Sequence, residues 1–339
     1  MRELVDDGPI SADLGVLVGK RIAVIGYGNQ GHAQAQNLRD SGADVLIGNR
    51  DDEYARRAHA DGFEVRPIRE ASAAADVLLL LIPDEVQPEV FGHEVAPVLA
   101  PGSTLVVASG YCLTFGLLDL PPRVDVVMVA PRMIGEAVRD HYVRRIGFPC
   151  LLSVEHDATG DAHGVALAVA RGIGVAAQDA VSSSAREEAA LDLFSEQAVW
   201  PTMFALLQAA YEVLHEAGFN DAAILDEMYL SGEPAEIFDR VARHGLLGQL
   251  GTHSTTSQYG QLRGLSRSTE LVHRLKQTFD TVLREDILSG AFAREWSQHS
   301  TDGEEAIAAL RKQAADHPLI QAEERVADRQ RAPDAAPRH

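Results

Sequence analysis

A glycine-rich turn between a strand and a helix is the feature that most constrains how this chain folds. Gly26-Tyr-Gly28-Asn-Gln-Gly31 follows the aliphatic residues 22–25 directly and precedes a helical pattern. The spacing G-x-G-x-x-G in this position is typical of a dinucleotide-binding βαβ unit. Gly26 permits a tight turn, Gly28 lets the backbone approach a pyrophosphate, and Gly31 allows the helix to pack closely on the strand. A glycine turn without a ligand is the alternative.

Short aliphatic runs continue through the first half of the chain and are separated by segments of helical length. Such runs predict strands that are buried on both faces, and with helices between them they predict a doubly wound parallel sheet of the α/β class. They occupy residues 22–25, 44–47, 77–82, 105–108, 124–129 and 150–154.

After Gly174 the pattern is helical, which predicts an all-α second domain. We expect a Rossmann domain over residues 1–181 and an all-helical domain over residues 182–324. Residues 325–339 hold two prolines and few large apolar side chains, so they predict a disordered tail.

The excess of acidic over basic residues indicates which kind of molecule the chain binds. The chain has 50 acidic and 30 basic residues, which argues against nucleic acid or an anionic membrane and favours a small molecule. The N-terminus lacks the features of a signal peptide, and the aliphatic residues 77–82 are too few to cross a bilayer, so we expect a cytoplasmic protein. Cys112 and Cys150 form no disulfide or zinc pattern.

Three carboxylates are spaced four residues apart in the second half of the chain. Glu188, Asp192 and Glu196 would stack on one face of a helix, where like charges destabilise each other. No lysine or arginine lies three or four residues from Asp192, so we expect a cation over this ladder. Mg²⁺ is the natural candidate because it prefers oxygen ligands, and a solvated acidic face is the alternative.

The residues after the second predicted strand bear on the choice between NADH and NADPH. Arg50 could hold a 2′-phosphate or stack on adenine, whereas the acids beside it, Asp52 among them, could accept a hydrogen bond from a free 2′-hydroxyl. Asn49 belongs to the same predicted coenzyme site. Three acids beside one arginine favour NADH weakly.

Several sequence motifs follow one another along the chain. They are Gly26-Tyr-Gly-Asn-Gln-Gly-His-Ala, Ile82-Pro-Asp-Glu-Val-Gln87, Met128-Val-Ala-Pro131, Glu187-Glu188, Asp192-Leu-Phe-Ser-Glu-Gln-Ala198, Tyr259-Gly260 and Gly290-Ala-Phe-Ala-Arg-Glu-Trp296. Taken together, these motifs resemble the short, class I form of ketol-acid reductoisomerase from about Asp13 to Trp296. The resemblance implies a Rossmann domain, a knotted helical C-terminal domain for metal, substrate and dimerisation, and a homodimer or higher homo-oligomer whose active sites take residues from both subunits. It implies further coenzyme contacts at Tyr27, Asn29, Gln30, Pro83, Asp84, Gln87 and Gly135.

Enzymes of that family move an alkyl group within a 2-hydroxy-2-alkyl-3-oxo acid held on two Mg²⁺ ions and then reduce the new 2-oxo group with NADPH. The resemblance implies that Asp192 bridges the metals, that Glu196 completes the first site, and that Glu227 of the partner subunit serves the second. Glu188 is implied to support this catalytic site.

Several positions depart from the family pattern. The family has a glutamate four residues after the position of Glu227, where this chain has Ser231, and a neutral hydroxyl is a poor replacement for a carboxylate ligand. Ser109 stands in place of a histidine that could transfer a proton, and Arg132 in place of a lysine. Arg132 would remain charged and could anchor a substrate carboxylate. Ser254 falls where the family binds that carboxylate, or it caps a helix.

Three functional hypotheses follow. The first is an NAD(P)H-dependent reductase on this scaffold that reduces the C=O or C=N group of a small carboxylate-bearing substrate with Mg²⁺, the alkyl migration being altered or lost. The second is a true ketol-acid reductoisomerase that makes branched-chain amino-acid precursors. The third is a non-catalytic dinucleotide-binding regulatory protein.

Overall fold

The structure is a computed structural model that describes residues 14–299 and 303–331. The chain divides between Asp192 and Leu193 into two compact units, which we call unit 1 and unit 2. The predicted boundary between residues 181 and 182 lies before helix α8 (Ala185–Phe194), whereas the division falls within that helix. Unit 1 therefore includes the first part of the acidic ladder.

Unit 1 is built on one eight-stranded sheet with the strand order β3-β2-β1-β4-β5-β6-β7-β8. Its registers are parallel from β3 to β6, with Ile22 opposite Val45 on one side and Val77 on the other. The strands are β1 Arg21–Ile25, β2 Asp44–Gly48, β3 Glu64–Arg66, β4 Val77–Leu80, β5 Thr104–Val107, β6 Asp125–Pro131, β7 Cys150–His156 and β8 Ala180–Ser182.

The sheet departs from the prediction in two respects. Strand β7 runs antiparallel to β6, so the sheet is not wholly parallel. Strands β3 and β8 were not predicted, and β8 lies beyond Gly174, after which only helices were expected. Each has only three residues and is only partly buried, so neither produces an apolar run long enough to predict a strand.

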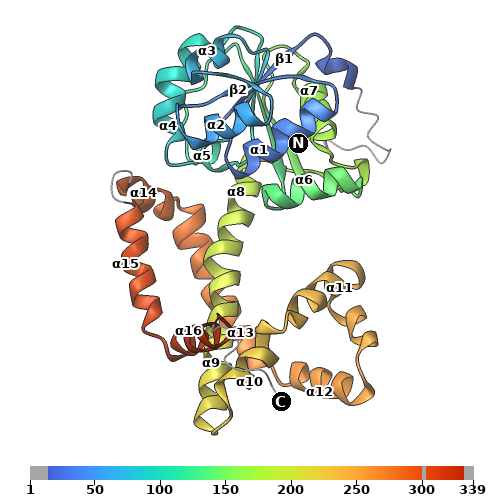
Figure 1. Ribbon diagram of the computed structural model, residues 1–339, viewed down its shortest axis with the longest axis vertical. Helices are drawn as coiled ribbons and strands as arrows, with labels where there is room; N and C mark the ends of the chain where they lie inside the picture. Colours follow the sequence, from blue (N-terminus) through green and yellow to red (C-terminus); the bar gives the residue numbers. More distant parts are fainter. Residues whose placement is uncertain (1–13, 300–302, 332–339) are drawn as a thin grey trace, which may run out of the picture. The chain divides into compact units, whose positions relative to one another are not determined.

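Helices cover the sheet of unit 1, with α1 and α6 next to each other (Figure 1). Asn37 of α1 joins three helices, because its side-chain amide donates to the Ile173 carbonyl of α7 at 2.8 Å and Arg139 of α6 donates to its oxygen at 2.8 Å. The main core lies under these helices and includes Ile22 and Val24 of β1. The helices are α1 Asn29–Asp40, α2 Glu53–Ala60, α3 Ile68–Ala73, α4 Gln87–Val90, α5 Tyr111–Thr114, α6 Gly135–Arg144 and α7 Ala162–Ile173, with 3₁₀ turns η1 Leu14–Leu17, η3 Ala96–Val98 and η4 Ala177–Asp179 and the π-helical turn η2 Phe91–Val95.

Unit 2 consists of helices in the part that the structure describes (Figure 1). Helix α16 continues to Arg331, so the prediction of a disordered tail from Arg325 is wrong for residues 325–331, while residues 332–339 lie outside the described part. The helical elements are η5 Ser195–Val199, α9 Trp200–Glu216, α10 Asp221–Leu225, η6 Asp226–Leu230, α11 Glu233–Gly248, η7 Gln249–Thr252, α12 Thr255–Ser266, α13 Thr269–Thr281, η8 Val282–Leu288, α14 Ala291–Gln298, α15 Gly303–Ala315 and α16 Pro318–Arg331.

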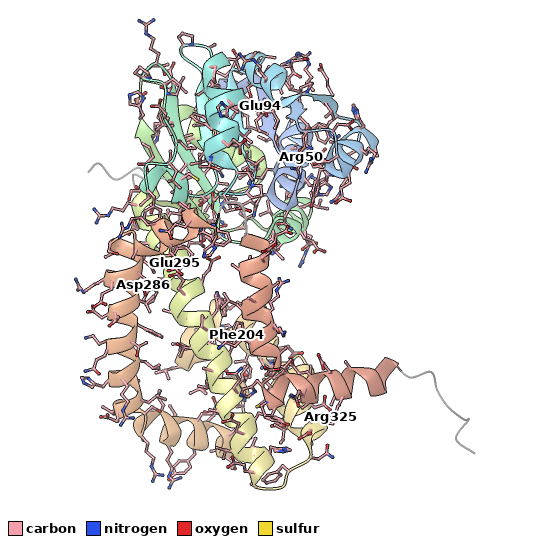
Figure 2. The ribbon with its side chains drawn as sticks, turned by 90° about the vertical axis from the view of Figure 1, so that its left-hand side faces the viewer. Arg50, Glu94, Phe204, Asp286, Glu295 and Arg325 are labelled. Atoms are coloured by element: carbon pink, nitrogen blue, oxygen red, sulfur yellow. The ribbon has the colours of Figure 1, made fainter. Side chains whose placement is uncertain are left out.

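Apolar side chains are buried sparingly in unit 2. Its main buried cluster contains Tyr211, Leu225 and Ala322. Large apolar side chains are exposed on the helices of unit 2, including Phe204 of α9, which Figure 2 labels, and Leu246 of α11. Within residues 14–299 and 303–331, no helix has both the length and the apolar composition needed to cross a bilayer.

Candidate functional site

The carboxyl ends of the parallel strands β1, β4, β5 and β6 meet at one edge of the sheet. This is the edge at which open α/β sheets bind ligands, near the point where the strand order reverses. In unit 1 that point lies between β1 and β4, because the chain moves outward from β1 on one side through β2 and β3 and on the other through β4. The glycine turn follows β1, Asp84 follows β4, Ser109 follows β5 and Arg132 follows β6.

Packing requires two of the three glycines in the turn. Gly26 has φ +92°, and a Cβ there would lie 2.8 Å from the Leu81 carbonyl oxygen. A Cβ on Gly31 would overlap the Gly26 carbonyl oxygen, whereas one on Gly28 would meet nothing within 4 Å. Gly28 is the N-cap of α1 and provides no side-chain cap. The turn is therefore open on the side of Gly28, and an anion bound there would face the first N–H groups of the helix.

The side chain of Tyr27 anchors this turn from inside. The ring is fully buried and packs edge-on against His32, with ring centroids 5.3 Å apart. The hydroxyl donates to Asp61 at 2.8 Å, and burial, with Asp61 adding to it, raises the pKa of Tyr27. The side chain of Tyr27 is therefore not accessible to a coenzyme, and the predicted contact at this residue would have to involve its backbone.

Asn29, Gln30 and Gly135, which were predicted to bind the coenzyme, connect α1 to α6. The Gly135 N–H donates to Asn29 Oδ1 at 2.6 Å, and Gln30 Nε2 donates to the Met133 carbonyl at 2.9 Å. A Cβ on Gly135 would overlap the Asn29 carbonyl oxygen. These residues hold the N-terminal ends of two helices together beside the turn, a role that their sequence spacing does not reveal.

The loop after β2 is organised around Asp52. Its carboxylate accepts hydrogen bonds from the N–H groups of Tyr54 and Ala55 and caps α2. Asn49 Nδ2 also donates to it, and Arg50 Nε donates to its other oxygen at 2.8 Å. The Arg50 side chain is otherwise 82% exposed at the surface of unit 1 (Figure 2).

The loop after β4 holds a buried carboxyl group. Gln87 Nε2 bridges the Ile82 carbonyl and Asp84 Oδ1, both at 2.9 Å, and so fixes the segment that follows Pro83. Burial raises the pKa of Asp84 to about 6, the Cys112 thiol opposes this rise, and the nearby charge of Asp192 adds to it. The Ser109 hydroxyl hydrogen-bonds to the same carboxyl and lowers its pKa. Asp84 is thus a group that exchanges a proton close to neutrality.

Glu188 and Asp192 of α8 share one guanidinium. Glu188 is buried, and its Oε2 accepts the Gly110 N–H at 2.6 Å. Arg132 donates from Nη1 to Glu188 Oε1 at 2.5 Å and from Nη2 to Asp192 Oδ1. Desolvation raises the pKa of Glu188, while the Gly110 N–H and Arg132 oppose the rise. A Cβ on Gly110 would overlap the Ala185 backbone, so this close approach requires glycine.

Arg132 provides a positive charge for two of the three ladder carboxylates, Glu188 and Asp192, and Mg²⁺ at this ladder stays a prediction. Sequence reasoning predicted a cation over Asp192 and named Mg²⁺, but the partner in the structure is Arg132, which lies far from Asp192 in sequence. The guanidinium faces two carboxylates of the protein, so its predicted anchoring of a substrate carboxylate stays a prediction. The α-helix ends at Phe194 and Glu196 lies in the π-helical turn η5, which interrupts the predicted four-residue stacking.

The serines named as candidate site residues have ordinary local partners. The Ser109 Oγ accepts the Tyr111 N–H at 3.2 Å. Ser254 is the N-cap of α12 and accepts the Ser257 N–H, as its capping alternative predicted. Ser231 follows the π-helical turn η6, and its hydroxyl accepts the Glu233 N–H at 3.4 Å.

The predicted metal ligands have suitable chemistry but do not form a complete set in one chain. Carboxylate oxygens fit Mg²⁺, and Arg132 contacts only Oδ1 of Asp192. Over residues 14–299 and 303–331, no three His, Cys, Asp or Glu side chains gather at a spacing that would hold a metal ion. Asp192 and Glu196 would need a further donor, as the expected Glu227 of a partner subunit would provide. Glu227 also lies in a π-helical turn, an irregularity frequent at functional sites that the sequence did not signal.

Comparison with known families covers nearly the whole described chain. The family model for the NADPH-binding domain of acetohydroxy acid isomeroreductase matches residues 16–178. The family model for the C-terminal domain of ketol-acid reductoisomerase matches residues 186–331. The second match includes the end of α16, where a tail had been predicted.

Individual proteins of this family are similar over almost their full length. "Putative ketol-acid reductoisomerase 3" of Saccharolobus solfataricus is 43% identical over 88% of this chain and 90% of its own length. "Ketol-acid reductoisomerase (NADP(+))" of Methanopyrus kandleri is 40% identical over 94% and 96%. The structure of an NADH-preferring ketol-acid reductoisomerase from an uncultured archean has a TM-score of 0.86 at 31% identity, covering 97% of this chain and 99% of that one. This chain is therefore an NAD(P)H-dependent oxidoreductase that belongs to the ketol-acid reductoisomerase family.

Proposed function

We propose that this enzyme catalyses the ketol-acid reductoisomerase reaction, converting 2-acetolactate-type acids into 2,3-dihydroxy acids with NAD(P)H. The names of relatives that are 40% and 43% identical support this reaction over a reductase that has lost the alkyl migration. The observation that carries the proposal is the presence of Glu188 and Asp192 at the sheet edge that also holds the glycine turn. This arrangement supports cation-binding carboxylates and a dinucleotide site at the same end of unit 1.

Different residues at this edge of the sheet would bind the coenzyme and the metal ion. The open side of the turn at Gly28 would bind the pyrophosphate, while Glu188 holds Arg132 in place. Asp192, Glu196 and Glu227 of a partner subunit would hold Mg²⁺. When bound, the ion supplies Lewis-acid polarisation of the hydroxyl and carbonyl oxygens of the substrate.

Asp84 is our candidate for the proton source, because Ser109 stands in place of the family histidine that could transfer a proton. Hydride addition to the 2-oxo carbon moves the C=O electron pair to oxygen, and the resulting alkoxide takes one proton. Asp84 has a pKa near 6 and hydrogen-bonds to the Ser109 hydroxyl, so the pair could deliver that proton. Serine would pass the proton while Asp84 becomes a carboxylate and is later reprotonated from solvent.

A reductase without the migration step is the second candidate. Ser109, Arg132 and Ser231 replace three polar groups that the family uses in one cavity, and Arg132 is paired with the predicted metal ligand Asp192. These observations favour weaker metal binding, on which the migration depends more than the hydride transfer does.

One assay separates the two candidates. Purified enzyme is incubated with Mg²⁺ and NADH or NADPH, and with either 2-acetolactate or the rearranged 3-hydroxy-2-oxo acid. We expect oxidation of the coenzyme with both acids. Turnover of the rearranged acid alone would contradict the reductoisomerase and support the reductase. Mass spectrometry of the product would identify the dihydroxy acid.

We propose that NADH is accepted at least as well as NADPH. Arg50 is the single cation of its loop and is already paired with Asp52, so a 2′-phosphate would have to compete with a carboxylate. The ratio of kcat/KM for the two coenzymes tests this. We expect Asp52→Asn to shift the ratio toward NADPH, and no shift would contradict this role.

We propose a homodimer or higher homo-oligomer with shared active sites. The exposed apolar side chains of unit 2 support this, because surfaces of this kind in a stable protein are normally covered by a partner. Light scattering after size-exclusion chromatography gives the mass directly, and a monomeric mass at micromolar concentration would contradict the assembly.

A further inference from the structure

We propose that Arg132 is an internal counter-ion that competes with the divalent cation for Asp192, so that cation binding requires the guanidinium to leave this carboxylate. The inference rests on the metal site of the proposed function and deepens it. It assigns Arg132 a task that neither its sequence position nor the family comparison supplies, namely control of how tightly the acidic pair takes a cation.

The two ends of the guanidinium are held unequally. Glu188 is buried, and its second oxygen is already occupied by the Gly110 N–H at 2.6 Å. Asp192 has a side chain that is 41% exposed, and Arg132 contacts one of its oxygens. The Glu188 end is therefore the fixed anchor, and the Asp192 end is the contact that can be exchanged with little disturbance of the core.

The chemistry of arginine makes this competition persistent. A guanidinium stays charged across the whole physiological pH range, so deprotonation cannot release Asp192. Its planar fork spans two carboxylates with separate N–H groups, and the Arg132 backbone is fixed by its own N–H, which donates to the Pro149 carbonyl at 2.8 Å. A single ammonium at this position would present a compact charge without this two-ended grip.

The released Nη2 group needs another acceptor, and both Glu188 oxygens already accept one hydrogen bond each, from Arg132 Nη1 and from the Gly110 N–H. A carboxylate on the substrate is an acceptor of the right charge and shape. Substrate carboxylate and divalent cation should then favour each other's binding, since each removes a partner from the Arg132–Asp192 pair. Such coupling is reciprocal by thermodynamic necessity.

The test measures cation affinity rather than turnover. Mn²⁺ is titrated into the full-length protein without coenzyme or substrate, and binding is followed by electron paramagnetic resonance and calorimetry. We expect Arg132→Gln to bind Mn²⁺ about fivefold more tightly than the wild type, the size of a partly exposed ion pair. Asp192→Asn should remove the binding, and Arg132→Lys should fall between the wild type and Arg132→Gln.

Arg139→Gln is the matched control. Arg139 also lies in unit 1, donates to a carboxylate of Asp40 and to Asn37, and has a side chain of similar exposure, 26% against 31% for Arg132. It changes the net charge equally and should leave Mn²⁺ affinity unchanged. The double variant Glu188→Gln with Arg132→Gln avoids an unpaired buried carboxylate and should keep the tighter binding if Arg132→Gln alone fails to fold.

Isobutyrate tests the coupling, because it offers one carboxylate and no second oxygen group for chelation. It should tighten Mn²⁺ binding in the wild type and have a smaller effect in Arg132→Gln.

Equal or weaker Mn²⁺ binding by Arg132→Gln and by the double variant would overturn the inference. If the wild type nevertheless turns over 2-acetolactate with Mg²⁺, the proposed function stands while this inference fails. If no variant binds Mn²⁺, the inference fails together with the metal site.

Discussion

The two units bury their apolar side chains to very different extents. In unit 1 the strands β4, β5 and β6 are buried along their whole length between layers of helices. In unit 2 the helices α11, α12 and α13 contain no buried residue, and apolar side chains such as Leu246 are exposed. Unit 1 therefore has a core that accounts for its own stability, whereas the exposed apolar surface of unit 2 supports the homo-oligomer proposed above.

The same contrast holds for the groups that carry function. The glycine turn, Asp84, Arg132 and Glu188 lie in unit 1 and are fixed by contacts within it. Glu196, Glu227 and Ser254 lie in unit 2, and the role predicted for Glu227 depends on a second subunit. In the function proposed above, the coenzyme half of the site comes from one chain and the metal half from two.

Truncation of one core leucine in each unit should have the largest effect on stability and should show the contrast between the units. Leu79 of β4 and Leu225 of α10 are both fully buried, and each change to alanine should cost about 2–5 kcal/mol of unfolding free energy. Chemical denaturation is the measurement. Because the cluster around Leu225 is small, Leu225→Ala should also make the stability depend more steeply on protein concentration, while Leu79→Ala should not. Equal concentration dependence in both variants would contradict the contrast.

Gly31→Ala should remove the coenzyme half of the site. The added Cβ would overlap the Gly26 carbonyl, and a backbone shift in a packed turn costs about 1–3 kcal/mol. We expect dinucleotide affinity, measured by isothermal titration calorimetry, to fall on the order of a hundredfold. Gly164→Ala in α7 meets no atom within 4 Å and should leave that affinity intact while stabilising the helix. Unchanged affinity in Gly31→Ala would refute the turn as the pyrophosphate site.

Asp84 should give unit 1 a characteristic pH dependence. Its pKa rises from 3.8 to about 6 on folding, so between about pH 4 and pH 6 the native state keeps a proton that the unfolded state has lost. This contribution is fully present below the unfolded value and is lost as the pH rises through the folded one, by about 2–3 kcal/mol at most. Asp84→Asn should flatten the decline, as measured by denaturation at several pH values. An unchanged slope would show that Asp84 ionises normally.

The smallest effect should come from relief of backbone strain in unit 1. Arg145, at the end of α6, has φ +59° and is the non-glycine residue in the described chain with a positive φ. Arg145→Gly should raise stability by about 0.5–1 kcal/mol, because glycine adopts this conformation without a steric penalty. Arg144→Gly, inside the last turn of the same helix, should instead lower stability by up to about 1 kcal/mol. A destabilised Arg145→Gly would mean that contacts of the side chain outweigh the strain.

The sequence predicted those parts of the fold that local pattern determines. Six strands, the helical second half and the glycine turn follow from apolar runs and from glycine spacing. The antiparallel direction of β7 and the short strands β3 and β8 depend on pairing with distant segments, which a single sequence does not encode locally.

Sequence analysis named several residues that the structure brings together, but it did not identify their contacts. Glu188, Asp192 and Arg132 were each identified, yet their ion pairs join residues that are far apart in sequence. The π-helical turns at Glu196 and Glu227 have no sequence signal comparable to a cap or a turn motif. Tyr27 and Gly135 lie in the predicted region but contribute packing there, which spacing alone does not distinguish from ligand contact.

A mixed-subunit experiment tests the division between the two units most directly. Asp192→Asn and Glu227→Gln are each expected to abolish turnover of 2-acetolactate, since each removes a carboxylate from every site. Subunits that carry the two changes separately are then produced together. If each site combines Asp192 of one chain with Glu227 of another, mixed dimers hold one intact site, and the mixture should recover about a quarter of the wild-type activity. Complete inactivity of correctly assembled mixed dimers would contradict a site that is shared between chains.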